Sequence, residues 1–225
     1  MAEYQQNQNL IKVYSSKSYS HNRIKRNSKH MKSVSSIKIY ITGIFLCLVF
    51  SCSENNPEQD IEKHLEQSRD ASKQLGSQLK GELKAGLKSQ GPVESIAICN
   101  VEAEIIASNV SKDANLEVGR TSLKVRNPSN TPDAWEKEKL IYFEQQIQTG
   151  MDGKTLEVYE VINEDNQKWF RYMKAIPTSE VCVVCHGETI AQPIKQRLEA
   201  LYPDDKATGY QVGDLRGAFT VKTKL

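Results

Sequence analysis

Histidine and cysteine are scarce in this sequence, which has four histidines and five cysteines among 225 residues. Beyond Cys52, the only histidines are His64 and His186, and no second Cys or His pair accompanies Cys182 and Cys185. A structural zinc site, which takes four protein ligands, is therefore excluded. No Ser-His-Asp triad or paired-carboxylate arrangement is recognisable either, so we expect that the protein is not an enzyme.

Long apolar runs are also lacking, because no stretch approaches the about 20 residues that a membrane-spanning helix needs. The run Ile41–Phe50 follows Lys32 and Lys38 and ends at Ser51-Cys52, which is the layout of a bacterial lipoprotein signal. We predict that residues 1–52 are an N-terminal extension and signal, with Met31 as the true start and Cys52 as the lipidated residue. An uncleaved short anchor is the alternative.

Basic residues are concentrated in that leader, so the formal net charge of +2 misrepresents the rest of the chain. After Cys52 there are 22 Lys and Arg residues against 27 Asp and Glu residues. This acidic excess gives no reason to expect nucleic acid as a partner. We predict a chain anchored by its lipid on the periplasmic side of a bacterial membrane, and Ser53 after Cys52 favours the outer membrane.

The remainder reads as a short tether over residues 53–59 and one domain over residues 60–225. Leucines at spacing four predict a long N-terminal helix over 58–91, and a second helix is expected over 93–110. A strand is expected over 116–126, and a helix capped by Thr131 should follow it. A hairpin around 164–166, a helix over 192–202 and a final strand over 213–225 complete an α+β fold with a small antiparallel sheet and flanking helices.

The motif Cys182-Val-Val-Cys185-His186 carries the most specific chemistry. Two thiols at this spacing can add to the vinyl groups of a haem, and the histidine that follows can bind its iron. A thioredoxin-like redox pair would follow a strand and open a helix in a βαβ unit, whereas this pair precedes a glycine and a polar loop. We therefore predict one covalent haem c, held by Cys182 and Cys185 with His186 on the iron. Because the motif occurs once, a multihaem electron-transfer protein is excluded.

The residue on the opposite face of the iron is less constrained by the sequence. The candidates are His64, Met151, Met173 and Cys99. Cys99 is the one thiol with no other assignment, and it lies among apolar residues of a predicted helix. Three arginines, Arg120, Arg126 and Arg216, are candidate contacts for the haem propionates, because guanidinium groups pair well with carboxylates.

Three segments, "RTSLKVRNPSNTPDAWE", "YMKAIPTSEVCVVCHG" and "LYPDDKATGYQVGDLRGAFTV", resemble those of a family of c-type haem proteins with a PAS-like fold, long catalogued as a domain of unknown function. The resemblance covers roughly residues 60–225. It implies a PAS-like sheet, one covalent haem, and iron ligation by His186 together with a cysteine from an N-terminal helix, here Cys99. Family members often form the extracytoplasmic sensing part of signalling proteins.

Ligation by histidine and thiolate would stabilise ferric iron and give a low reduction potential. Release of Cys99 on reduction would open a position for a diatomic gas. We therefore expect a redox- or gas-responsive haem sensor that acts on an unknown signalling or redox partner. The alternative is a periplasmic electron-transfer cytochrome, and a haem enzyme has less support.

Overall fold

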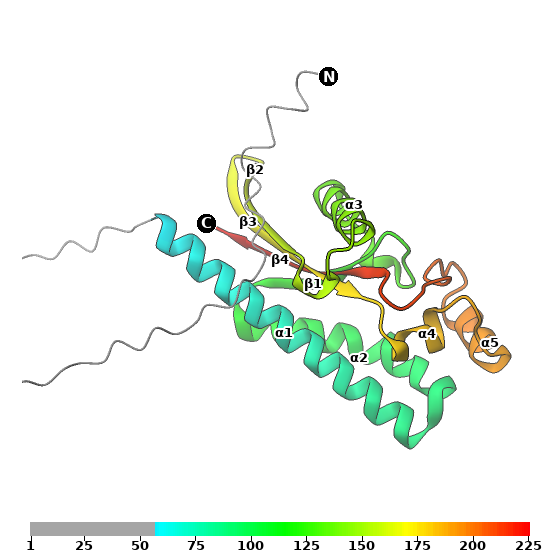
Figure 1. The fold of residues 1–225 in the computed structure, drawn as a ribbon. Helices are drawn as coiled ribbons and strands as arrows, with labels where there is room; N and C mark the ends of the chain where they lie inside the picture. The colour runs from blue at the N-terminus through cyan, green and yellow to red at the C-terminus, as the bar shows by residue number, and fades with distance from the viewer. Residues whose placement is uncertain (1–56) are drawn as a thin grey trace, which may run out of the picture.

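A four-stranded antiparallel sheet forms the centre of the computed structural model, which describes residues 57–225 (Figure 1). Its spatial order is β1-β4-β3-β2, from strands β1 (Glu117–Thr121), β2 (Glu157–Glu164), β3 (Gln167–Pro177) and β4 (Leu215–Lys224). The predicted α+β class with a small antiparallel sheet is confirmed, whereas its PAS-like character stays a prediction. The predicted leader, tether and lipidated Cys52 lie outside the described residues.

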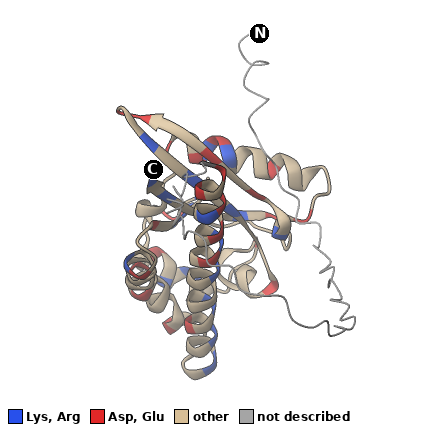
Figure 2. Ribbon diagram, turned by 90° about the vertical axis from the view of Figure 1, so that its left-hand side faces the viewer, with Lys and Arg blue, Asp and Glu red and all other residues tan. Residues whose placement is uncertain are grey.

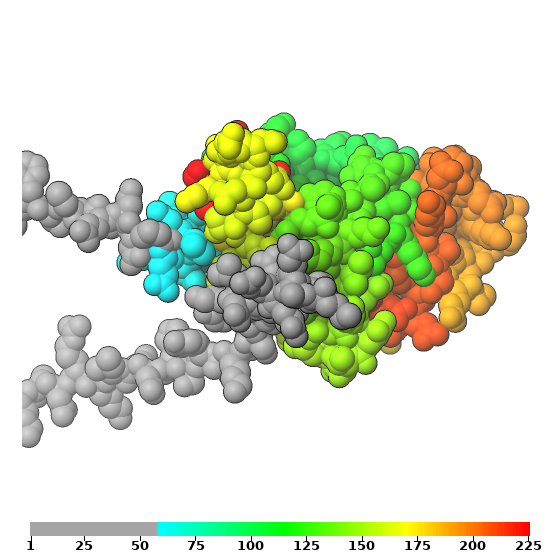
Figure 3. Space-filling model, turned by 90° about the horizontal axis from the view of Figure 1, so that it is seen from above, coloured from blue at the N-terminus to red at the C-terminus, as the bar shows by residue number. Residues whose placement is uncertain are grey.

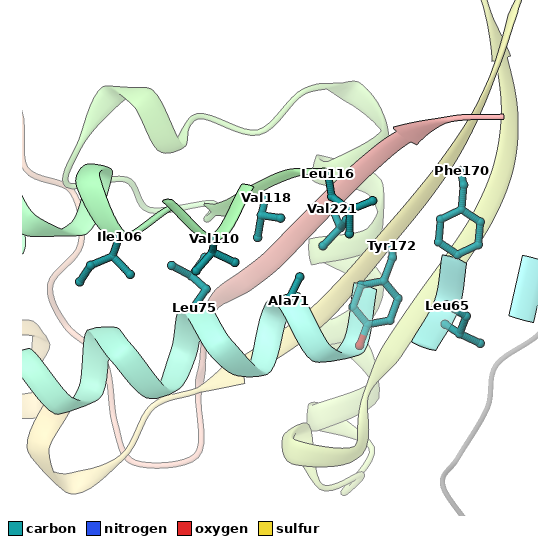
Figure 4. Close-up of a cluster of buried hydrophobic side chains, with 10 residues drawn as sticks. All are labelled: Leu65, Ala71, Leu75, Ile106, Val110, Leu116, Val118, Phe170, Tyr172 and Val221. Atoms are coloured by element: carbon teal, nitrogen blue, oxygen red, sulfur yellow. The ribbon is translucent and has the colours of Figure 1, made fainter. Parts of the chain in front are cut away.

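Two long helices, α1 (Pro57–Ser89) and α2 (Gly91–Ala114), form a hairpin that covers one face of the sheet. Figure 4 shows side chains from both helices converging on β3 and β4, where Phe170, Tyr172 and Val221 are buried. The leucine spacing predicted this helix correctly. Of those leucines, Leu75 is buried in this cluster and Leu79 packs against it. This first core fixes where α2 lies against the sheet.

Helix α3 (Ala134–Gln148) covers the opposite face and forms a second core around Leu140, Phe143 and Met173. The prediction that Thr131 caps this helix was wrong. Asp133 is the N-cap, and it forms a capping box in which its side chain accepts a hydrogen bond from the backbone of Glu136 while the Glu136 side chain accepts one from the backbone of Asp133. The Thr131 hydroxyl instead donates to the carbonyl of Pro128.

The predicted hairpin is confirmed, because β2 and β3 pair in register around Asp165 and Asn166. Both turn residues have positive φ, as the two-residue turns that suit twisted strands require. The first strand is shorter than predicted. It ends at Thr121 because the Ser122 amide donates to the carbonyl of Asn130 and its hydroxyl donates to that of Arg216, which bends the chain away from the sheet.

Two short helices, α4 (Glu180–His186) and α5 (Gln192–Leu201), lie together beyond the end of the sheet (Figure 1). Figure 3 shows that they and the segment before β4, coloured orange to red, gather at one end of the molecule. Short 3-10 turns at Pro128–Asn130 and Gly153–Thr155 complete the fold. This end of the molecule holds most of the residues that the sequence singled out.

Within residues 57–225, none of the helices combines the length and apolarity needed to cross a membrane. Figure 2 shows acidic and basic residues interspersed along the helices and strands.

A buried arginine joins the sheet to the start of α3. Arg171 on β3 is 2% exposed, and its guanidinium lies 2.6 Å from an oxygen of Asp133 and 3.4 Å from one of Glu136. It also stacks over the ring of Trp135. Burial acts to raise the pKa of Asp133, but hydrogen bonds from Arg171 and from the backbone of Glu136 lower it overall. The ion pair therefore sets the position of α3 on the sheet.

We predict that Arg171→Met lowers the free energy of unfolding by about 3 kcal/mol, because it leaves the carboxylates of Asp133 and Glu136 without their buried partner. Urea denaturation at neutral pH measures this. Lys168→Met, on the exposed side of the same strand, is the control and should change stability by no more than about 0.5 kcal/mol. Equal effects of the two substitutions would contradict the role given to Arg171.

Candidate functional site

The Cys-x-x-Cys-His motif forms helix α4, which begins directly after β3 and ends at His186. Cys182 and Cys185 are one turn apart and so lie on the same side of the helix. Gly187 is the C-cap, where the backbone becomes extended and the helix ends. Its amide still donates to the carbonyl of Val183, and a Cβ at Gly187 would lie 2.5 Å from that same oxygen. The motif therefore needs glycine after its histidine for a steric reason.

The imidazole of His186 is held by the loop that precedes β4. Its Nδ1 lies 2.7 Å from the carbonyl oxygen of Ala207, which can only accept, so Nδ1 carries the proton. The backbone of His186 is held as well, because its carbonyl accepts from the amide of Tyr210. Burial, followed by the positive charges of Arg216 and Arg126, places the pKa of His186 well below its usual value. The ring is therefore neutral at pH 7, with a lone pair on Nε2.

Packing between α2 and α5 brings Cys99 to the same place. Ile96, one turn before Cys99, is buried in a third cluster with Ile194, Leu198 and Tyr202, and Cys185 packs against this cluster. Cys99 is close enough to Cys185 that its negative charge contributes to raising the pKa of the Cys185 thiol, after the larger effect of burial. The structure thus brings together two sequence-predicted residues that are far apart in the chain.

The Cys99 side chain is accessible to solvent, yet enough protein surrounds it that desolvation raises the pKa of its thiol. The positive charges of Arg120 and Arg126 act in the opposite direction and favour the thiolate. Cys99 therefore lies in a partly desolvated, positively charged environment that solvent can still reach.

The three predicted arginines all face this environment, but they are held differently. Arg126 is bound to Asp205, and Arg216 donates to the hydroxyl of Ser122 and lies over the ring of Tyr210. In the part of the chain that the structure describes, no hydrogen bond or ion pair holds the guanidinium of Arg120. Burial lowers the pKa of both Arg120 and Arg216. A desolvated cation without a counter-ion is costly, so the site favours an anionic ligand.

The other candidate ligands lie elsewhere. Met173 is fully buried, and Met151 partly buried, in the core beneath α3. His64 lies on α1 with its ring against that of Phe170. Of the four candidates, only Cys99 has an electrostatic interaction with the Cys-x-x-Cys-His motif.

Two residues of the site were missed by the sequence analysis. Asp205 pairs with Arg126, and Ala207 supplies the carbonyl that holds His186. The paired acidic residues in the segment "YPDDKATGY" were a visible signal, but their partner lies on a distant loop. Over residues 57–225, no group of three or more His, Cys, Asp or Glu side chains is arranged to hold a bare metal ion.

Comparison with known proteins gives one family and one fold. The family described as Tll0287-like matches residues 2–223 of the chain. The crystal structure of the cyanobacterial heme-protein Tll0287 is similar with a TM-score of 0.52 and 23% sequence identity, and the match covers 75% of this chain and 96% of that chain. This likeness shows a shared fold. No curated protein matches the chain.

We predict that Gly187→Ala lowers the free energy of unfolding by about 2 kcal/mol, because its new methyl group must displace the Val183 carbonyl or the end of α4. Gly81→Ala is the matched control, since no atom lies within 4 Å of the added carbon. It should stabilise α1 by up to about 1 kcal/mol. Urea denaturation of both variants measures the difference, and a neutral or stabilising Gly187→Ala would show that the close contact is relieved without cost.

Proposed function

This chain belongs to the Tll0287-like family, and on that premise we propose that it is an exported, lipid-anchored protein with one covalent haem c that acts as a redox- or gas-responsive sensor. The observation that carries the proposal is the convergence of Cys99 from α2 with the Cys-x-x-Cys-His motif of α4. The lipid anchor at Cys52, the periplasmic location and the preference for the outer membrane are part of the same proposal and rest on the leader sequence.

The thiols of Cys182 and Cys185 suit covalent attachment, because one helical turn presents both on the same side of α4. His186 follows directly and would bind the iron through Nε2. Its Nδ1–H donates to the Ala207 carbonyl, and a hydrogen bond of this kind fixes the orientation of a metal-bound histidine and raises its basicity. When bound, the haem supplies an iron that exchanges between ferric and ferrous states.

Cys99 would provide the second iron ligand as a thiolate. Desolvation raises the pKa of its thiol, and the positive charges of Arg120 and Arg126 offset part of that effect. Gain of one electron by a bound haem iron would weaken its attraction for the thiolate, so reduction would favour protonation and release of Cys99. A thiolate ligand therefore supports a responsive site over a simple electron carrier.

The arginines would meet the anionic edge of the haem. Arg120 is the strongest candidate for a propionate, since no residue of the described chain holds its guanidinium by a hydrogen bond or ion pair. Arg216 could reach a propionate while it remains stacked on Tyr210. Arg126 is a weaker candidate, because Asp205 and two backbone carbonyls already accept its hydrogen bonds.

We predict that Cys99→Ser changes the ferric absorption spectrum of the matured protein and raises its reduction potential, because a serine hydroxyl does not replace the negative charge of a thiolate. Val101→Ser, at an exposed position of the same helix, is the control and should leave both unchanged. An unchanged spectrum in Cys99→Ser would remove Cys99 from the iron.

We predict further that the ferrous protein binds carbon monoxide, since reduction would release Cys99 and leave a position on the iron open. Absorption spectra of both states with and without the gas, recorded over a range of pH, measure this. Ligation that stays fixed through redox cycling at every pH would contradict the sensor and favour the electron-transfer alternative.

A further inference from the structure

Arg126 and Asp205 form a buried ion pair next to the proposed iron ligand. Each side chain is 10% exposed. The Arg126 Nε donates to a carboxylate oxygen of Asp205 at 2.9 Å, and Nη2 lies 2.9 Å from the same oxygen. Arg126 lies on the segment after β1, whereas Asp205 lies in the loop after α5. An ion pair this far from solvent is expected to have a defined geometry, because neither partner can turn to water without leaving the other unpaired.

The same guanidinium also donates to two backbone carbonyls near His186, one from the preceding residue and one from the loop that holds its ring. Its Nη2 donates to the carbonyl of Cys185 at 2.6 Å and to that of Ala207 at 3.3 Å. Asp205 also binds the backbone of Ala207, since its second carboxylate oxygen accepts from the amide of Ala207 at 2.8 Å. Ala207, whose carbonyl receives the Nδ1–H of His186, is therefore held by two bonds from the pair: Arg126 donates to its carbonyl, and Asp205 accepts from its amide.

The position of Arg126 also explains why it needs a counter-ion. Its Nη1 lies 3.5 Å from Nε2 of His186, the unprotonated nitrogen, which accepts this long contact. Asp205 and the two carbonyls direct the stronger hydrogen bonds of Arg126 away from that nitrogen. Without the carboxylate, Nε2 is a nearby acceptor for a buried cation that has lost its partner.

We propose that Arg126 and Asp205 are positioning residues that fix the Nδ1–H tautomer and the ring orientation of His186 through the Ala207 carbonyl. The inference rests on the proposed role of His186 as an iron ligand. It assigns Arg126 a task in the protein itself, in place of a contact to a propionate.

The test uses the matured full-length haem protein and compares Asp205→Asn with Arg126→Lys. The readout is the rate at which the His186 Nδ1–H exchanges with deuterium, followed by proton nuclear magnetic resonance of the ferric protein. We expect exchange about tenfold faster in each variant, the change that corresponds to the net strength of one hydrogen bond. Electron paramagnetic resonance should show shifted ferric g values, since they depend on how the axial imidazole is oriented.

Asp204→Asn is the matched control, because Asp204 is the adjacent carboxylate and is exposed. It should keep the parent exchange rate and g values. Arg126→Lys keeps the charge opposite Asp205 but cannot bridge two carbonyls as a guanidinium does, so it tests positioning even where Asp205→Asn does not fold. Parent-like exchange in Arg126→Lys would overturn the inference.

Failure of the proposed function gives a different result. A parent protein without covalently attached haem, judged from its pyridine haemochrome spectrum, would remove the premise and with it the inference. Covalent haem in the parent with unaltered Nδ1–H exchange in the variants would overturn the positioning role alone.

Discussion

The site depends on the packing of α2 against α5. Ile96 is buried with Ile194, Leu198 and Tyr202, and Cys185 lies at the edge of this cluster. Because α2 is also fixed against the sheet through Ile106 and Val110, it cannot move freely relative to α4. A few apolar contacts thus place the Cys99 thiol beside a motif that is far from it in the sequence. A substitution that loosened them would separate Cys99 from the motif without touching either.

Charge is the second constraint on this end of the molecule. Arg120, Arg126 and Arg216 lie close enough to influence one another, and burial lowers the pKa of two of them. Of these three, only Arg126 has a buried carboxylate partner in the described chain. The surplus of desolvated positive charge suits a thiolate and the carboxylates of a propionate-bearing group. Burial first, and this positive charge second, lower the pKa of His186 and keep it neutral. The positive charges that would stabilise the proposed thiolate and propionates would also attract an electron added at the iron.

Sequence patterns predicted the parts that depend on local rules. The leucine spacing of α1, the turn at Asp165-Asn166 and the Cys-x-x-Cys-His motif each carry their information within a few residues. The errors were also local in origin: Thr131 and Asp133 are both good caps, and only the capping box with Glu136 decides between them. Cys99 was a candidate because it is the one cysteine with no other assignment. The Arg126–Asp205 pair was not predictable, because nothing in a single sequence relates a loop after β1 to a loop after α5.

Iron ligation by both His186 and Cys99 is the central claim, and X-ray absorption at the iron K edge tests it most directly. The matured ferric protein should show a single sulfur neighbour of thiolate type, and Cys99→Ser should show none. A parent spectrum without sulfur would contradict the claim. Sulfur that persists in Cys99→Ser would contradict it equally, since the ligand would then be a methionine.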